Sequence, residues 1–225
     1  MIVKKFKLIE ITDFIWSDYR ENLENTLGQF KHRPRDVAFE MMKRYIASSF
    51  PFVFSFNDFC RLITLQGEPG GNNLLHPEVV AHVRSDLDHF ELYKRDYLKY
   101  SAWNIPVDLN PFISLHNSIW RCYEQTSSEH YYHLLLVFEV MSTCWLGKWH
   151  ELSETHQLDF HFLGNVHLAE DDYKIHLLSH REILEDVLPQ TTFWLFRKCY
   201  DEISSGFITW FSSELSKTEM EESRK

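Results

Sequence analysis

Apolar residues recur along most of the chain at intervals of three and four positions, which is the period of an amphipathic α-helix. Glycines and prolines, which interrupt helices, fall in a few places between these stretches. The pattern predicts helices over about 9–30, 34–48, 56–65, 76–100, 110–126, 128–151, 156–182 and 190–217. Seven or eight helices with short connections predict one all-α domain over residues 1–217, followed by a charged, frayed tail over 218–225.

The composition supports this interpretation. The chain has only 7 glycines and 7 prolines in 225 residues, so it has few tight turns, and long helices are favoured over a sheet of many strands. Hydrophobic residues make up 44% and aromatic residues 16%, enough for one sizeable core. We expect more than about half of the residues in helices, and a sheet of three or more strands would contradict this prediction.

The charge and the hydropathy of the sequence argue against a nucleic-acid-binding protein and against a membrane-spanning or exported one. The net charge is −10 and the lysines and arginines are scattered, so no basic surface is available for a nucleic acid. The most apolar stretch, residues 131–149, is interrupted by His133, Glu139 and Lys148, which indicates a buried helix and not a membrane span. The amino terminus lacks the apolar core of a signal peptide. We therefore expect a soluble, cytoplasmic protein that does not bind a membrane.

The four cysteines lie far apart and form no CxxC motif. This spacing is typical of reduced, mostly buried thiols in a cytosolic protein. They are Cys60, Cys122, Cys144 and Cys199.

The predicted helix over 76–100 carries the first group of candidate ligands. His82, Asp86 and His89 are spaced at i, i+4 and i+7, so they lie within about 60° of one another around a helix axis. Three groups that can bind a metal would then share one face. The alternative is a helix edge at the boundary of the core, with each histidine paired to a carboxylate.

Glu139 lies in the middle of the apolar stretch LLLVFEV over residues 134–140. A buried carboxylate costs several kcal/mol unless it is paired, protonated or bound to a metal. Glu139 is therefore a candidate metal ligand, and a buried salt bridge or an exposed helix edge are the alternatives.

The segment FHFLGNVHLAEDDYKIHLLSH over residues 160–180 carries the third group. His167, Asp171 and Lys174 repeat the i, i+4, i+7 spacing, and Glu170 and His161 lie near the same face. Helical proteins hold iron or manganese with carboxylates and imidazoles that project from facing helices. Two such stripes and an isolated glutamate, on three helices, predict a metal centre.

Three segments of the chain resemble the heme-oxygenase-like diiron oxidases and oxygenases: DLDHFELYKRDYL (86–98), LLLVFEV (134–140) and FLGNVHLAEDDYK (162–174). That family has an E/D-x-x-H motif on one helix, a lone glutamate on a middle helix and H-x-x-x-D-x-x-H on a later one. The resemblance covers residues 75–180 and preserves the order of the three elements. It implies a heme-oxygenase-like bundle and metal ligands at Asp86, His89, Glu139, His167 and Asp171.

The resemblance also implies an activity. Members of the family use two irons, or iron with manganese, and dioxygen to oxidise, N-oxygenate or cleave small molecules such as amino acids and fatty acids. Here the substrate would be a small organic molecule bound in a dry pocket. Candidate lining residues are Tyr93, Phe138, Trp145 and Trp149.

Lys174 departs from the family, which has a histidine at this position. An ammonium group cannot bind a metal unless its pKa falls far below ~10.4. His176 is rotated by about 200° from Lys174 on a regular helix, so it is a poor substitute. Lys174 would pair with Asp171 or Glu170 and compete with a second metal, so we expect nearer one metal than two, or an empty site. His82, Glu170 and Lys174 are thus further candidate site residues.

The leading hypothesis is a non-heme metal-dependent oxidoreductase that uses one or two iron ions, or manganese, with dioxygen. A non-catalytic helical binding protein with a degenerate metal site is the first alternative. A hydrolase similar to thiaminase II is the second, and it would need a cysteine in a pocket. A true heme oxygenase is disfavoured, because its glycine-rich distal helix is missing. The oligomeric state is open, a homodimer included.

Overall fold

The computed structural model describes residues 5–66, 90–161 and 181–222. Within these ranges most residues are helical, which confirms the all-α prediction. The only strands in this part of the chain are β1 (Phe6–Lys7) and β2 (Val187–Leu188), which pair antiparallel with Phe6 opposite Leu188.

The helices follow one another in this order: α1 (Leu8–Leu27), the 3-10 turn η1 (Gly28–His32), α2 (Arg35–Gln66), a helix over 90–99, η2 (Ala102–Asn104), α4 (Asn110–Gln125), η3 (Ser128–His130), α5 (Tyr131–Thr155), α8 (Arg181–Leu184) and α9 (Gln190–Glu222).

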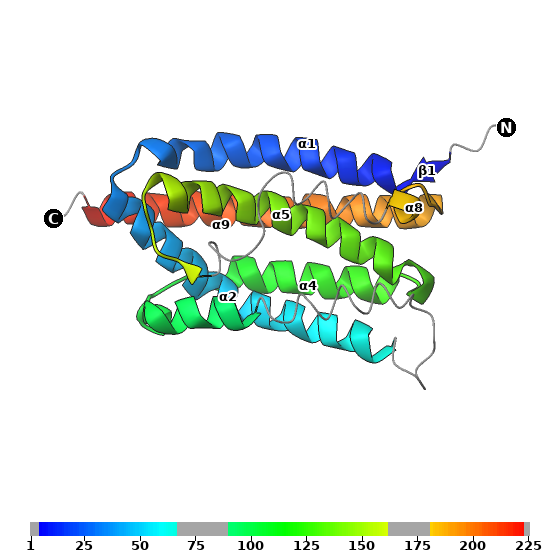
Figure 1. The fold of residues 1–225 in the computed structure, drawn as a ribbon, viewed down its shortest axis with the longest axis horizontal. Helices are drawn as coiled ribbons and strands as arrows, with labels where there is room; N and C mark the ends of the chain where they lie inside the picture. Colours follow the sequence, from blue (N-terminus) through cyan, green and yellow to red (C-terminus); the bar gives the residue numbers. More distant parts are fainter. Residues whose placement is uncertain (1–4, 67–89, 162–180, 223–225) are drawn as a thin grey trace.

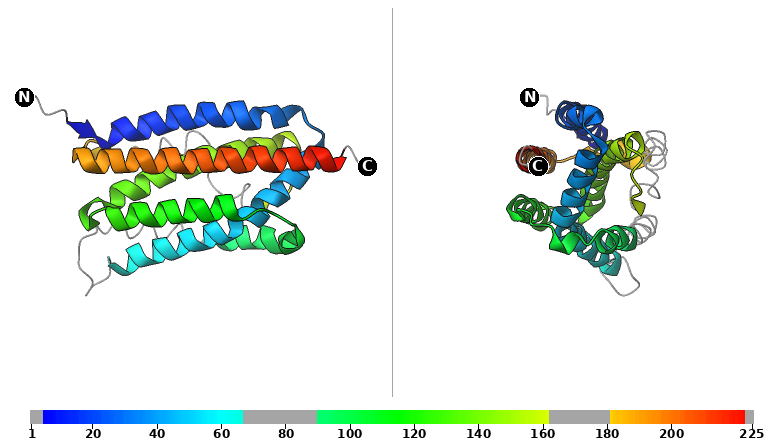
Figure 2. Two further views of the ribbon diagram at one scale, coloured as in Figure 1. Left: turned by 180° about the vertical axis from the view of Figure 1, so that it is seen from behind. Right: turned by 90° about the vertical axis from the view of Figure 1, so that its left-hand side faces the viewer.

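The long helices form an elongated bundle (Figure 1). α1, α5, α9 and the 90–99 helix run in one direction along it, and α4 runs in the other. α2 starts beside the carboxyl end of α1 and crosses the bundle to the side of α4 and the 90–99 helix (Figures 1 and 2). This crossing joins the two sides of the molecule.

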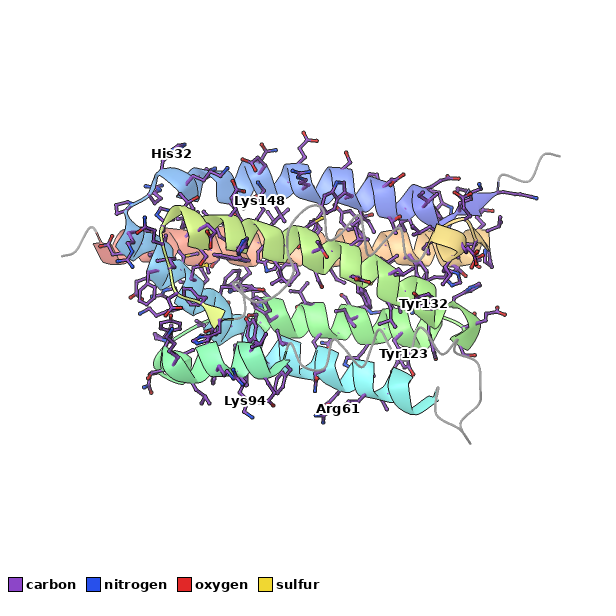
Figure 3. All side chains as sticks on the ribbon, viewed as in Figure 1. His32, Arg61, Lys94, Tyr123, Tyr132 and Lys148 are labelled. Atoms are coloured by element: carbon purple, nitrogen blue, oxygen red, sulfur yellow. The ribbon has the colours of Figure 1, made fainter. Side chains whose placement is uncertain are left out.

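α1 shows why the sequence folds as predicted. Its buried residues follow the helical period, so one face packs on α5 and α9 while the other stays polar. They are Leu8, Ile11, Thr12, Ile15, Tyr19, Leu23 and Leu27. On the polar side Lys148 of α5 reaches towards α1 (Figure 3) and forms ion pairs with Glu24 and, at 2.9 Å, with Glu151.

The predicted break near Pro51 is wrong. α2 is one continuous helix, although we expected separate helices over 34–48 and 56–65. Pro51 is exposed, and the neighbouring Phe50 is stacked on Tyr97 with ring centroids 4.0 Å apart. Packing by Phe50 therefore outweighs the local cost of the proline, and α2 changes direction along its length instead of ending (Figure 1).

Two further boundaries differ from the prediction. Residues 156–160 form a turn and an extended segment, so the helix expected from 156 does not begin there. α9 continues beyond Lys217 to Glu222, five residues past the end predicted for this helix, and its Thr218 is buried against Met41. This contact with α2 extends the helix.

Tyr45 of α2 lies at the centre of the core. Its ring stacks on Trp149 with centroids 4.7 Å apart, and lies 5.6 Å from Trp145 and 5.9 Å from Trp210. Aromatic pairs of this kind contribute roughly 0.5–1.5 kcal/mol beyond the area they bury. The core therefore joins α2, α5 and α9 through one residue.

In the part of the chain that the structure describes, none of the helices is sufficiently long and apolar to cross a membrane. This agrees with the reading of α5 as a buried helix: its apolar residues pack on α1, α2 and α9.

Candidate functional site

Only one of the predicted ligands, Glu139, lies in the described ranges. His82, Asp86, His89, His167, Glu170, Asp171 and Lys174 lie outside them. Among the described residues, no group of three or more histidines, cysteines, aspartates or glutamates could hold a metal ion. The convergence of the five predicted ligands therefore stays a prediction.

Glu139 lies in the middle of α5 and is half-buried. The residues before and after it, over 132–138 and 140–141, are all buried. Its carboxylate thus occupies a border position on a helix that is otherwise packed into the core. An ionised group in such surroundings needs a cation, a metal or hydrogen-bond donors.

A second arrangement joins the segments that carry the other predicted ligands. Asp96, on the 90–99 helix, is fully buried, and its Oδ1 accepts hydrogen bonds from both the backbone N–H and Nδ1 of His161, at 2.9 and 3.0 Å. His161 is 39% exposed, so this imidazole connects a buried carboxylate with the surface. Because Nδ1 donates to Asp96, the lone pair of the neutral ring is on Nε2.

The segment that carries His161 is fixed by contacts along its whole length. Gln157 adopts a left-handed backbone (φ 52°), which is uncommon for a residue with a side chain. Arg35 donates from Nε to the carbonyl of His156 at 2.9 Å and from a terminal nitrogen to that of Gln157 at 3.1 Å. These bonds from the start of α2 hold the strained turn.

The next residues are held from the 90–99 helix and the turn after it. Lys99 donates to the carboxylate of Asp159 at 2.7 Å, and the Tyr100 hydroxyl donates to the Asp159 carbonyl. Phe160 is buried and packs on Tyr100, with centroids 4.6 Å apart. His161 is therefore positioned against Asp96 by a rigid segment.

Hydroxyl groups line the interior beside Asp96. Tyr93, one turn before Asp96, hydrogen-bonds to Ser49, and Ser49 donates to the Tyr45 carbonyl at 2.6 Å. Burial raises the pKa of the Tyr93 hydroxyl well above its usual range, and the nearby Tyr45 and Asp96 add to this effect. Tyr93 therefore stays protonated and serves as a hydrogen-bond donor or acceptor.

An imidazole oriented by a carboxylate can do two things with its second nitrogen: accept and return a proton, or bind a metal. The sequence indicated His161 only as a neighbour of the third group and did not indicate Asp96. One signal was present, because Asp96 follows His89 by seven residues and extends the spacing of His82, Asp86 and His89.

The described cysteines do not suit a nucleophile. Cys122, Cys144 and Cys199 are free and buried, and burial raises the pKa of the Cys144 thiol to about 12. The pKa of Cys199 is also raised, by its hydrogen bond with Cys122 and by burial. The thiols of Cys144 and Cys199 therefore carry little thiolate at neutral pH, which disfavours the thiaminase-like alternative for these two residues.

The chain has no match among family models, curated proteins or solved structures. The resemblance of residues 75–180 to the heme-oxygenase-like oxidases is thus a prediction from the sequence.

Proposed function

We propose that this protein is an oxidase of a small organic substrate that depends on non-heme iron or manganese and uses dioxygen. The observation that carries the proposal is Glu139: a half-buried carboxylate in the middle of α5, with buried residues on both sides of it in the sequence. A carboxylate at such a position can bind a cation at the border of the core, and it is the position that the resemblance assigns to a metal ligand.

The position of Glu139 along the axis of the bundle, compared with that expected for His89, supports the proposal. Tyr93 and Trp145 both contact Tyr45, and the 90–99 helix and α5 run in the same direction. His89 precedes Tyr93 by four residues and Glu139 precedes Trp145 by six, or about 6 Å and 9 Å of helix rise. If the helix predicted over 76–100 is continuous, His89 and Glu139 come to similar levels.

The Asp96–His161 hydrogen bonds support the same grouping. They join the helix that follows His82, Asp86 and His89 to the residue from which the segment with His167 and Asp171 starts. In two of the three predicted ligand groups, the nearest ligands, His89 and His167, are thus seven and six residues from the contacting pair Asp96 and His161.

In the proposed centre Asp86, His89, Glu139, His167 and Asp171 would hold the metal, which would activate dioxygen so that the substrate is oxidised. Tyr45, Trp145 and Trp149 are buried, and an aromatic lining of this kind would exclude water from the substrate. Tyr93 and Ser49 provide the hydroxyl groups that could hold a polar part of the substrate.

Substitution of Glu139 tests the proposal. Glu139→Gln removes the charge at nearly constant shape, so we expect the affinity for Fe²⁺, measured by anaerobic equilibrium dialysis, to fall at least tenfold, with a matching loss of iron-dependent oxygen uptake. Glu124→Gln, at an exposed position of α4, is the control and should bind iron like the unmodified protein. Equal iron binding by folded Glu139→Gln and unmodified protein would contradict the role of Glu139.

A further inference from the structure

Two histidines at the start of α5 have buried ring nitrogens without hydrogen-bond partners. His130 ends η3 and His133 lies in the first turn of α5, and their rings meet edge to face with centroids 5.1 Å apart. In the described part of the chain, three ring nitrogens have no hydrogen-bond partner: Nδ1 and Nε2 of His130, and Nδ1 of His133. Tyr123 and Tyr132, labelled in Figure 3, mark this end of the bundle.

The remaining nitrogen of His133 connects this end to the amino terminus. His133 Nε2 lies 3.0 Å from Oδ2 of Asp186, in the turn between α8 and β2. The backbone carbonyl of Asp186 accepts a hydrogen bond of 3.1 Å from the N–H of Leu8, the first residue of α1. Asp186 therefore links α5, the start of α1 and the β1–β2 pair.

We propose that His130, His133 and Asp186 form a pH-sensitive latch that holds β1 and the α8–β2 turn on the bundle at neutral pH and loosens them in acid. A protonated imidazole has two N–H donors. On His133 the added Nδ1–H would be buried without an acceptor, and on His130 the carboxylate oxygen of Glu129 lies 3.7 Å from Nε2, beyond hydrogen-bond distance. Protonation of both rings would also place two positive charges about 5 Å apart, and this repulsion acts against the attraction between a charged His133 and Asp186.

The groups that face His130 come from three elements: Glu129 of η3, His133 of α5, and Asp186 of the α8–β2 turn. Burial and then His133 lower the pKa of His130, while Glu129 and Asp186 act in the opposite direction. The carboxylates of Glu129 and Asp186 are 73% and 53% exposed, so solvent screens their attraction.

The sign of the pH dependence follows from the lowered pKa of His130. The loosened state, in which the ring is in water, binds a proton more tightly than the closed latch. The stability of the latch is thus fully present above about pH 6.5 and falls as the pH drops below that value.

Hydrogen exchange measured by NMR tests the latch. Between pH 7.5 and 5.5 we expect the protection factor of the Leu8 amide, which donates to Asp186, to fall about three- to tenfold after correction for the intrinsic rate. The amide of Tyr200, in the middle of α9, is the internal control and should keep its protection.

His130→Gln should abolish the pH-dependent fall in the protection factor of the Leu8 amide. His150→Gln, at another half-buried histidine of α5, should leave this fall unchanged. If His130→Gln does not fold, His133→Gln is used for the same measurement. The proposal is overturned if Leu8 keeps its protection at pH 5.5, if the fall persists without His130 and His133, or if Tyr200 loses protection in parallel, since that would indicate global unfolding. The latch proposal does not depend on the proposed metal centre.

Discussion

Asp96 illustrates how a single buried charge organises its surroundings. Its carboxylate is fully buried and accepts two hydrogen bonds from one residue that is 65 positions away in the sequence. One of these donors is the backbone N–H of His161 and the other is Nδ1 of its ring. Asp96 thus fixes both the main chain and the imidazole of His161.

Asp96→Ala should lower the free energy of unfolding by about 1–3 kcal/mol, because it removes a fully buried acceptor and leaves the N–H of His161 without it. Urea denaturation measures this loss. Glu91→Ala on the same helix, which removes an exposed ion pair with Lys94, is the control and should change stability by less than about 0.5 kcal/mol. If both variants have the same stability, Asp96 does not anchor His161.

Among single residues, the sequence revealed those that differ from their neighbours along the chain. It did not reveal residues whose contacts are with parts of the chain far away in sequence. Glu139 was found because a carboxylate in an apolar run is anomalous within a few residues. Asp96 lies among charged neighbours and looks like a surface residue, since the burial that makes it important comes from contacts distant in sequence. His133 is also anomalous in the apolar stretch, but its partner Asp186 is 53 residues away, so the sequence did not indicate the cluster of His130, His133 and Asp186.

Among the helices, α2 shows the limit of local signals. Pro51 removes one backbone hydrogen bond and predicts a break, and the break does not occur. Phe50 packs on Tyr97 on one side of the helix, while Pro51 is exposed on the other. The sequence shows the cost of the proline but not the tertiary contacts that offset it.

Pro51→Ala should therefore raise the free energy of unfolding, by at most about 3 kcal/mol, which is the cost of a proline in a helix interior. Thermal and urea denaturation give the change. Pro189→Ala, just before α9, lies outside a helix interior and should give no gain. A loss of more than about 1 kcal/mol in Pro51→Ala would show that the proline is needed to hold Phe50 against Tyr97.

For the whole molecule, the scarcity of glycine and proline and the helical period were sufficient to predict the all-α class. They did not reveal the β1–β2 pair, because two residues on each side are too few for a strand pattern. The heme-oxygenase-like arrangement and the metal centre depend on how residues 75–180 come together. That part of the prediction rests on motif order and spacing.

The most direct test of the metal centre is the number of metal ions per chain in protein purified without chelator and then supplied with Fe²⁺ or Mn²⁺ in the absence of oxygen. Because Lys174 stands where the family has a histidine, we expect about one ion per chain, rising towards two in Lys174→His. Two ions in the unmodified protein would contradict our account of Lys174, and no bound metal would contradict the proposed oxidase itself.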